Sequence, residues 1–207
     1  MSSFEAYFAS HDFLFVARSE QGTPDFIRTE CARLDLARYA TVILDEPTRG
    51  QAETVALGLD RAAVPDAAPL TIFNIDTFRP GFRFPIRFDP DVVDGYLEVF
   101  RGSGENWSFV RPPDPGSDRV AETAEKVAIS DLCCTGLYHF RAAGLYRRAY
   151  GPCRDGAAQA LGVRELYVAP LYNLLIRDGC DIRYELIPRE AVIFCGVPAE
   201  YEAFLKG

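Results

Sequence analysis

Residues 70–76 read LTIFNID, an apolar run that ends in Asn74, Ile75 and Asp76. Apolar, β-branched and aromatic residues in such a short run predict a buried strand. Open α/β sheets bind ligands beyond the carboxyl ends of their strands, which is where Asp76 would lie. A lone aspartate at a strand end is more often a turn or a helix cap, so Asp76 becomes a candidate site residue only through the motifs around it.

Further apolar runs surround this strand, and helical patterns separate them. We expect other strands over 13–16, 41–44, 107–110, 132–140 and 182–187. We expect helices after Thr23, after Gly50, over 164–178 and over 198–205. The alternation predicts one three-layer α/β domain over residues 1–207, with a mostly parallel, Rossmann-like central sheet and an antiparallel flank around 104–140.

The charge balance excludes several classes of partner. Thirty acidic residues against 22 basic ones give a net charge of −8. Such a chain gains nothing from counterion release on nucleic acid, and it has no basic cluster, so we expect neither nucleic acid nor a membrane surface as a partner. The first residues lack the pattern of a signal peptide, and no apolar run approaches the roughly 20 residues that span a bilayer.

The six cysteines are scattered without a C-x-x-C motif, and the chain has only two histidines. This distribution offers no plausible spacing for a zinc site. Free, mostly buried thiols fit a reducing compartment, so we expect a cytoplasmic location.

Six short motifs follow one another in a characteristic order. They are GQAET at 50–54, NID at 74–76, EK at 125–126, TGLYHF at 135–140, ELYVAP at 165–170 and GVP at 196–198. This series resembles the sugar-phosphate nucleotidyltransferases with a glycosyltransferase A-type fold, in particular their short bacterial relatives found with capsule and surface-polysaccharide genes. The resemblance spans nearly the whole chain and depends on the order and spacing of the motifs.

The resemblance implies an enzyme that joins a nucleoside triphosphate to a phosphorylated sugar, or a similar phosphorylated small molecule, and releases pyrophosphate. It implies that Gly50 and Gln51 meet the nucleobase and that Asn74 belongs to the substrate-binding surface. It also implies that Asp76 holds Mg²⁺, a hard cation that prefers oxygen ligands. Metal and cationic groups would then stabilise charge while the protein aligns the reacting groups.

The same resemblance assigns the acceptor side. Glu125 would accept hydrogen bonds from sugar hydroxyls, and Lys126 would offer its charge to the acceptor phosphate. Thr135 and Gly136 would line the acceptor pocket, and Glu165 would bind another hydroxyl. Without this context Glu125 and Lys126 would be a solvated charge pair, and Glu165 would be a favourable partner of a helix dipole.

Two features depart from the family pattern. The family opens with a strand and a loop of the form G-x-G-x-R, followed by a Pro-Lys pair, and nothing of this kind precedes Phe13. Losing those groups should cost far more than the roughly 2.7–4 kcal/mol attributed to one preorganised donor. Many relatives also carry a second metal-binding aspartate before the last helix, where residues 192–198 here read VIFCGVP.

Three interpretations follow from these departures. The sequence starts inside a longer natural protein, or the chain is a degenerate relative that binds nucleotide, sugar or a partner without catalysis. The third is an unrelated activity on a similar fold, such as glycosyl transfer with a metal held by Asp76. Without its first strand the sheet would expose a backbone edge or apolar surface near residues 13–16, so we expect a homo-oligomer or poor solubility.

Overall fold

The computed structural model describes residues 2–20, 22–154, 165–196 and 202. Its amino-terminal part is a β-α-β unit that follows a short 3₁₀ helix. The elements are η1 (Ser2–Tyr7), β1 (Phe13–Arg18), α1 (Thr23–Arg33) and β2 (Tyr39–Leu44). The two strands pair in parallel, from Phe13 opposite Tyr39 to Arg18 opposite Leu44. The strands expected over 13–16 and 41–44 are therefore confirmed.

Helix α1 differs in detail from the sequence-based expectation. Gly22, with φ +80°, precedes the helix, and Thr23 is its first residue rather than its cap. The apolar pattern predicts an inner face of Phe26, Ile27, Cys31 and Leu34. Ile27 and Cys31 are buried against Phe8, and Leu34 packs partly buried beside them. The prediction is wrong for Phe26, which is 62% exposed because it lies one position away from that face.

Among the described residues the larger sheet has six strands, arranged around the fully buried β8. They are β3 (Leu70–Ile72), β5 (Gly95–Arg101), β6 (Ser108–Arg111), β7 (Glu122–Glu125), β8 (Leu132–Phe140) and β9 (Ile182–Leu186). The order is β7-β6-β8-β5-β9, and β3 pairs with the far end of β8. Among the described strands of this sheet only β5 and β9 run parallel, so it is mixed rather than mostly parallel.

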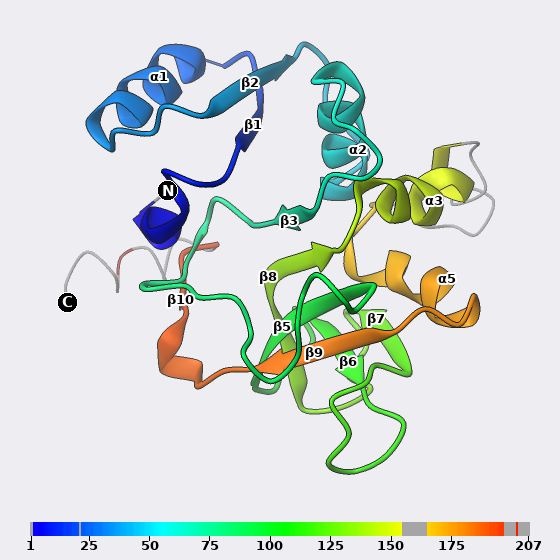
Figure 1. Cartoon of the computed structure of the whole chain (residues 1–207). Coiled ribbons are helices and arrows are strands. Elements are labelled where there is room, and N and C mark those ends of the chain that lie inside the picture. Colours follow the sequence, from blue (N-terminus) through cyan, green and yellow to red (C-terminus); the bar gives the residue numbers. More distant parts are fainter. Residues whose placement is uncertain (1, 21, 155–164, 197–201, 203–207) are drawn as a thin grey trace.

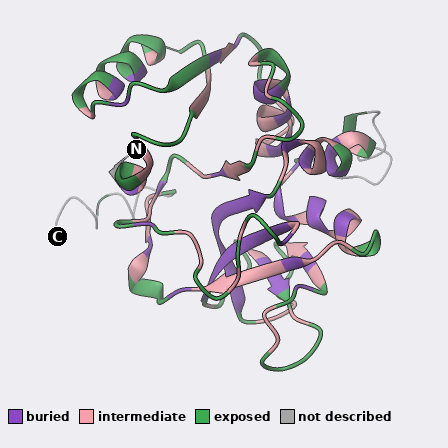
Figure 2. Ribbon diagram, viewed as in Figure 1, coloured by how far each residue is buried: buried purple, intermediate pink, exposed green. Residues whose placement is uncertain are grey.

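Helices cover this sheet and share its core. They are α2 (Gln51–Arg61), α3 (Ala143–Arg154), η2 (Ala169–Leu171) and α5 (Tyr172–Arg177). Figure 1 places α2 and α3 beside β3, between the β1–β2 unit and the six-stranded sheet. Figure 2 shows that the buried residues gather in the six-stranded sheet, whereas the β1–β2 unit is mostly half-buried or exposed.

One expected helix is much shorter in the structure. The pattern over 164–178 predicts a continuous helix, but the chain forms η2 and then α5 from Tyr172 to Arg177. Pro170 lies in the first turn of η2, where its missing backbone N–H is tolerated, whereas the interior of a helix running from 164 would not accommodate it, which accounts for the late start. Gly179, with φ +81°, follows the helix end, in the position where glycine commonly terminates a helix. The closing helix expected over 198–205 lies, apart from residue 202, outside the described residues.

The carboxyl-terminal part of the chain returns to the segment that follows β3. After the 3₁₀ turn η3 (Arg189–Ala191), strand β10 (Ile193–Phe194) pairs antiparallel with β4 (Thr77–Phe78). The pairing places the chain around residue 195 directly beside Asp76. No helix in the described part of the chain is long and apolar enough to cross a membrane.

Candidate active site

The turn before α2 packs against the segment around Leu166. Gly50 has φ +138° and ψ −179°, a conformation that is essentially restricted to glycine. A Cβ atom at this position would lie 2.6 Å from the Leu166 carbonyl oxygen and 2.9 Å from Cγ of Glu165. The backbone N–H of Leu166 donates to the Arg49 carbonyl at 2.7 Å, and the N–H of Ala52 donates to the Leu166 carbonyl at 3.0 Å. The turn and residues 165–166 therefore form one unit.

An ion pair that the sequence analysis missed supports this turn. The Arg49 side chain donates from Nε to Oε1 of Glu53 at 2.8 Å, and the Arg49 backbone N–H donates to Oε2 at 2.6 Å. The guanidinium group also donates to the Tyr150 hydroxyl at 3.2 Å. The Arg49 side chain lowers the pKa of Glu53 by hydrogen bonding. The i, i+4 spacing of arginine and glutamate was the available sequence signal.

Three predicted site residues converge beyond the end of β3. The strand ends at Ile72, so Asn74 leaves the sheet and meets α2. The Gln51 amide Nε2 donates to Oδ1 of Asn74 at 2.5 Å. Gly136, with φ +92°, lies against the same side chain, because a Cβ atom there would be 2.8 Å from Nδ2 of Asn74. Gln51, Asn74 and Gly136 therefore share one surface.

Asp76 is exposed and lies at the start of β4. The Cys195 backbone N–H donates to the Asp76 carbonyl at 2.8 Å. The stretch in which the sequence analysis sought a second carboxylate therefore lies beside Asp76 and offers backbone and a thiol instead. The described residues contain no group of three or more His, Cys, Asp or Glu side chains arranged to hold a metal ion. An exposed carboxylate of this kind fits Mg²⁺ as one ligand among substrate phosphates and waters.

Thr135 is buried behind this surface. Its hydroxyl donates to Oε1 of Glu98 at 3.1 Å, and Arg79 pairs with Glu98 with an N–O distance of 3.0 Å. Burial raises the pKa of the Glu98 carboxyl, while the positive charge of Arg79 opposes that shift. Arg79 also donates to the Ala191 carbonyl at 3.3 Å. Thr135 thus bonds to the buried ion pair that joins Arg79, directly after β4, to Glu98 of β5.

Glu125 and Lys126 do not form the solvated pair considered from the sequence. Glu125 accepts a hydrogen bond from Ser108, and burial raises the pKa of its carboxyl group. Lys126 is exposed, and its Nζ atom donates to the Tyr167 hydroxyl at 2.5 Å. That hydroxyl in turn donates to Oε2 of Glu165. Lys126 and Glu165 are therefore joined through Tyr167.

These contacts form one closed circuit. The Lys126 backbone N–H donates to the Trp107 carbonyl at 2.9 Å, and the ring centroids of Trp107 and Phe194 lie 4.7 Å apart. Contacts and short stretches of chain run in order through Gly50, Glu165, Tyr167, Lys126, Trp107, Phe194, Cys195, Asp76, Asn74 and Gln51. Contacts therefore connect predicted residues of the nucleotide, metal and acceptor sides, whereas Thr135 is buried behind them.

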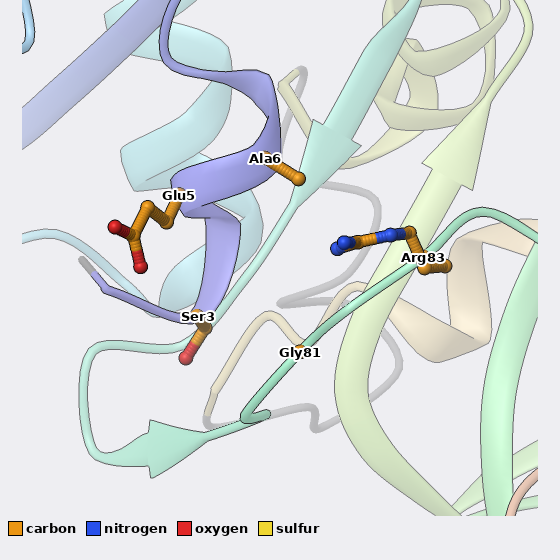
Figure 3. Close-up of a pocket in the computed structure, with 5 residues that line it drawn as sticks. All are labelled: Ser3, Glu5, Ala6, Gly81 and Arg83. Atoms are coloured by element: carbon orange, nitrogen blue, oxygen red, sulfur yellow. The ribbon is translucent and has the colours of Figure 1, made fainter.

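A separate cavity of about 310 Å³ lies between η1 and the loop after β4. Its lining residues are Ser3, Glu5, Ala6, Gly81 and Arg83. In Figure 3 the Arg83 side chain extends from the loop toward η1, and Glu5 projects from η1. None of the predicted site residues lines this cavity.

Among known proteins, no family model matches the chain, and no curated protein matches it. Among solved structures, the UDP-glucose pyrophosphorylase complexed with UDP-glucose has a TM-score of 0.71 at 11% identity, over 99% of this chain and 84% of that chain. The inositol-1-phosphate CTP transferase from T. maritima has a TM-score of 0.66 at 13% identity, over 90% of this chain and 71% of that chain. These two likenesses confirm the predicted fold class.

A third structure is similar in sequence as well as in fold. The nucleoside-diphosphate-sugar pyrophosphorylase from Vibrio cholerae RC9 is 49% identical, with a TM-score of 0.93, and the match covers 100% of this chain and 85% of that chain. Identity of this extent over the whole chain confirms the resemblance inferred from the motif series. The chain therefore belongs to the sugar-phosphate nucleotidyltransferase family.

Proposed function

We propose that the chain serves nucleotidyl transfer from a nucleoside triphosphate to a phosphorylated sugar or a similar phosphorylated small molecule. In this reaction an oxygen of the acceptor phosphate forms a bond to the α-phosphorus, the bond from that phosphorus to the β-phosphate oxygen breaks, and pyrophosphate leaves. The observation that carries the proposal is the closed circuit of contacts, which joins the residues assigned to nucleotide, metal and acceptor.

The nucleotide side of the proposal uses the turn before α2. Gly50 has no side chain, so a planar base can approach the backbone there closely. Gln51 and Asn74 already donate and accept between themselves, and each amide keeps further groups for the edge of a base. Packing of the turn against Leu166 holds these groups in place before a ligand binds.

The acceptor side uses charge of both signs. Lys126 carries a compact positive charge suited to a phosphate, and Glu165 offers carboxylate oxygens to a sugar hydroxyl. The hydrogen bond to Tyr167 is the chief cause that raises the pKa of Lys126 above its ordinary value, so the ammonium form persists to higher pH. Glu125 and Gly136 complete the proposed acceptor surface.

Asp76 is the proposed magnesium ligand. Magnesium commonly keeps several waters and binds through one or two carboxylates together with substrate phosphates. When bound, magnesium would neutralise phosphate charge while the bond between the α-phosphorus and the β-phosphate oxygen breaks. We further propose a cytoplasmic protein that supplies surface-polysaccharide synthesis, a role supported by the resemblance to capsule-associated relatives.

A second candidate is a protein that binds nucleotide or sugar phosphate without catalysis. The described stretch beside Asp76 supplies no second carboxylate. This feature weakens metal-assisted transfer while leaving Gln51, Asn74 and Lys126 available for binding.

Two measurements separate these candidates. Pyrophosphate release is followed with Mg²⁺, a panel of nucleoside triphosphates and pooled sugar phosphates, for this chain and for a form extended upstream in frame. Binding is followed by the fluorescence of Trp107, the single tryptophan, whose backbone and ring belong to the circuit. Release of pyrophosphate supports the transferase, and binding without release supports the second candidate. If the chain shows neither release nor binding, both candidates are refuted.

A further inference from the structure

Lysine is rare in this protein. Of its 22 basic residues only Lys126 and Lys206 are lysines, and the others are arginines. Arginine forms fixed, forked hydrogen bonds, whereas the lysine ammonium group is a mobile point charge on a four-carbon stem. A lysine in a functional position therefore needs a partner that fixes where its charge lies.

Hydrogen bonds fix both the backbone and the side-chain ammonium group of Lys126. Its backbone has φ +55°, a left-handed conformation that is uncommon outside glycine, and its N–H donates to the Trp107 carbonyl at 2.9 Å. Its Nζ atom lies 2.5 Å from the Tyr167 hydroxyl and 4.8 Å from the centre of the Tyr167 ring. The side chain is therefore directed along one path, toward Tyr167.

Tyr167 connects this ammonium group to the nucleotide side of the site. Its hydroxyl receives a hydrogen bond from Lys126 and donates its own proton to Glu165. Glu165 packs on Gly50, where its Cγ atom would be 2.9 Å from a Cβ atom. One phenol thus sets the position of Lys126 relative to the turn before α2.

Stability alone does not account for this arrangement. Lys126 and Glu165 are both exposed, and exposed charged pairs contribute little to the stability of a protein. The benefit of the contact is therefore geometric, because an ammonium group with three donors can bind a phosphate while it still donates to the phenol.

We propose that Tyr167 is a positioning residue, whose hydroxyl holds the Lys126 ammonium group where the phosphate of the acceptor binds. The inference rests on the proposed function, because it assigns Tyr167 to the acceptor side of that site. It predicts that Tyr167 affects phosphorylated acceptors and not their unphosphorylated counterparts.

The first test needs no ligand. Protein labelled with ε-¹³C lysine gives two side-chain signals, and their titration with pH measures the pKa of Lys126 and of Lys206. Tyr167→Phe keeps the ring and removes the hydroxyl, so the pKa of Lys126 should fall while that of Lys206 stays unchanged. Tyr184→Phe is the matched control, since it also loses one hydroxyl hydrogen bond, to the Ser117 carbonyl at 2.8 Å. An unchanged Lys126 titration in Tyr167→Phe overturns the proposed contact.

The second test measures acceptor binding through Trp107 fluorescence, with sugar 1-phosphates, the same sugars without phosphate, and nucleoside triphosphates. Loss of a hydrogen bond to a charged group should weaken sugar-phosphate binding about tenfold in Tyr167→Phe. Binding of the free sugars and the triphosphates should change by less than about twofold. Adding Tyr167→Phe to Lys126→Met should cause no further loss, because the phenol acts through the ammonium group.

The outcomes distinguish this inference from the proposed function. A wild-type chain that binds neither triphosphate nor sugar phosphate refutes the proposed function, and the inference with it. A wild-type chain that binds both, with Tyr167→Phe unaffected, refutes only the inference. Equal losses with phosphorylated and free sugars, or additive losses in the double variant, also refute it.

Discussion

Replacing Gly50 with alanine tests how the turn before α2 is held against the segment around Leu166. The added methyl group would lie 2.6 Å from the Leu166 carbonyl oxygen and 2.7 Å from its nitrogen. Both are backbone atoms, so the clash cannot be relieved by turning a side chain. The backbone conformation of Gly50, with φ +138° and ψ −179°, is also unfavourable for alanine.

The expected cost has two parts. Strain in this backbone region is worth about 1–3 kcal/mol. Moving Leu166 away weakens the hydrogen bonds from Leu166 to Arg49 and from Ala52 to Leu166, each worth about 0.5–1.5 kcal/mol. We expect Gly50→Ala to lower the free energy of unfolding by about 4 kcal/mol. For a domain of this size the melting temperature should fall by about 8–16 °C.

Gly116→Ala is the matched control. Gly116 has φ +87°, but a Cβ atom there would meet nothing within 4 Å. Only the backbone strain remains, so this variant should lose about 1–2 kcal/mol. Calorimetry and urea unfolding of the two variants measure the difference. If Gly50→Ala is no less stable than Gly116→Ala, the packing of the turn against Leu166 is not as described.

Three further predictions concern metal use, pH and association. Asp76→Asn should abolish Mg²⁺-dependent pyrophosphate release in an active form of the protein. Because Asp76 is exposed, the free energy of unfolding should change by no more than about 0.5 kcal/mol. Unchanged turnover would exclude the metal role of Asp76. Burial raises the pKa of Glu125 above its ordinary value of 4.5. The protonated carboxyl group therefore contributes stability below pH 4.5, and this contribution is lost as the pH rises through the raised pKa of the folded state. Urea unfolding between pH 4 and 8 should therefore show a flatter dependence in Glu125→Gln, and an identical slope would contradict this. In the described chain β1 pairs with β2 alone and its apolar residues are only half-buried, so gel filtration should show a homo-oligomer; a monomer at all concentrations would refute this.

The sequence by itself determined the fold class, the family and the identity of most strands. The runs at 13–16, 41–44 and 132–140 could be located because burial on a sheet imposes a local pattern of apolar residues. Gly50 and Gly136 could be singled out because their neighbours form family motifs. The structure adds the reason for each glycine, namely the approach of Leu166 and of Asn74.

Helix α3 had a sequence signal that was missed. Its buried residues Ala143, Tyr146 and Tyr150 recur at helical spacing, among arginines that make the segment polar overall. The late start of the helix expected over 164–178 was also readable from Pro170, because proline favours the first turn of a helix over its interior. These errors concern local patterns, which a closer analysis of the sequence can recover.

Only the tertiary structure decided which side chains meet. Arg79 and Glu98 form a buried ion pair across 19 positions, and Lys126 reaches Tyr167 across 41. The closure of the circuit at Asp76 depends on β10, which returns from the far end of the chain. Local patterns record how each segment meets water or core, whereas such pairings depend on how distant segments are placed in space, and no local pattern contains that information.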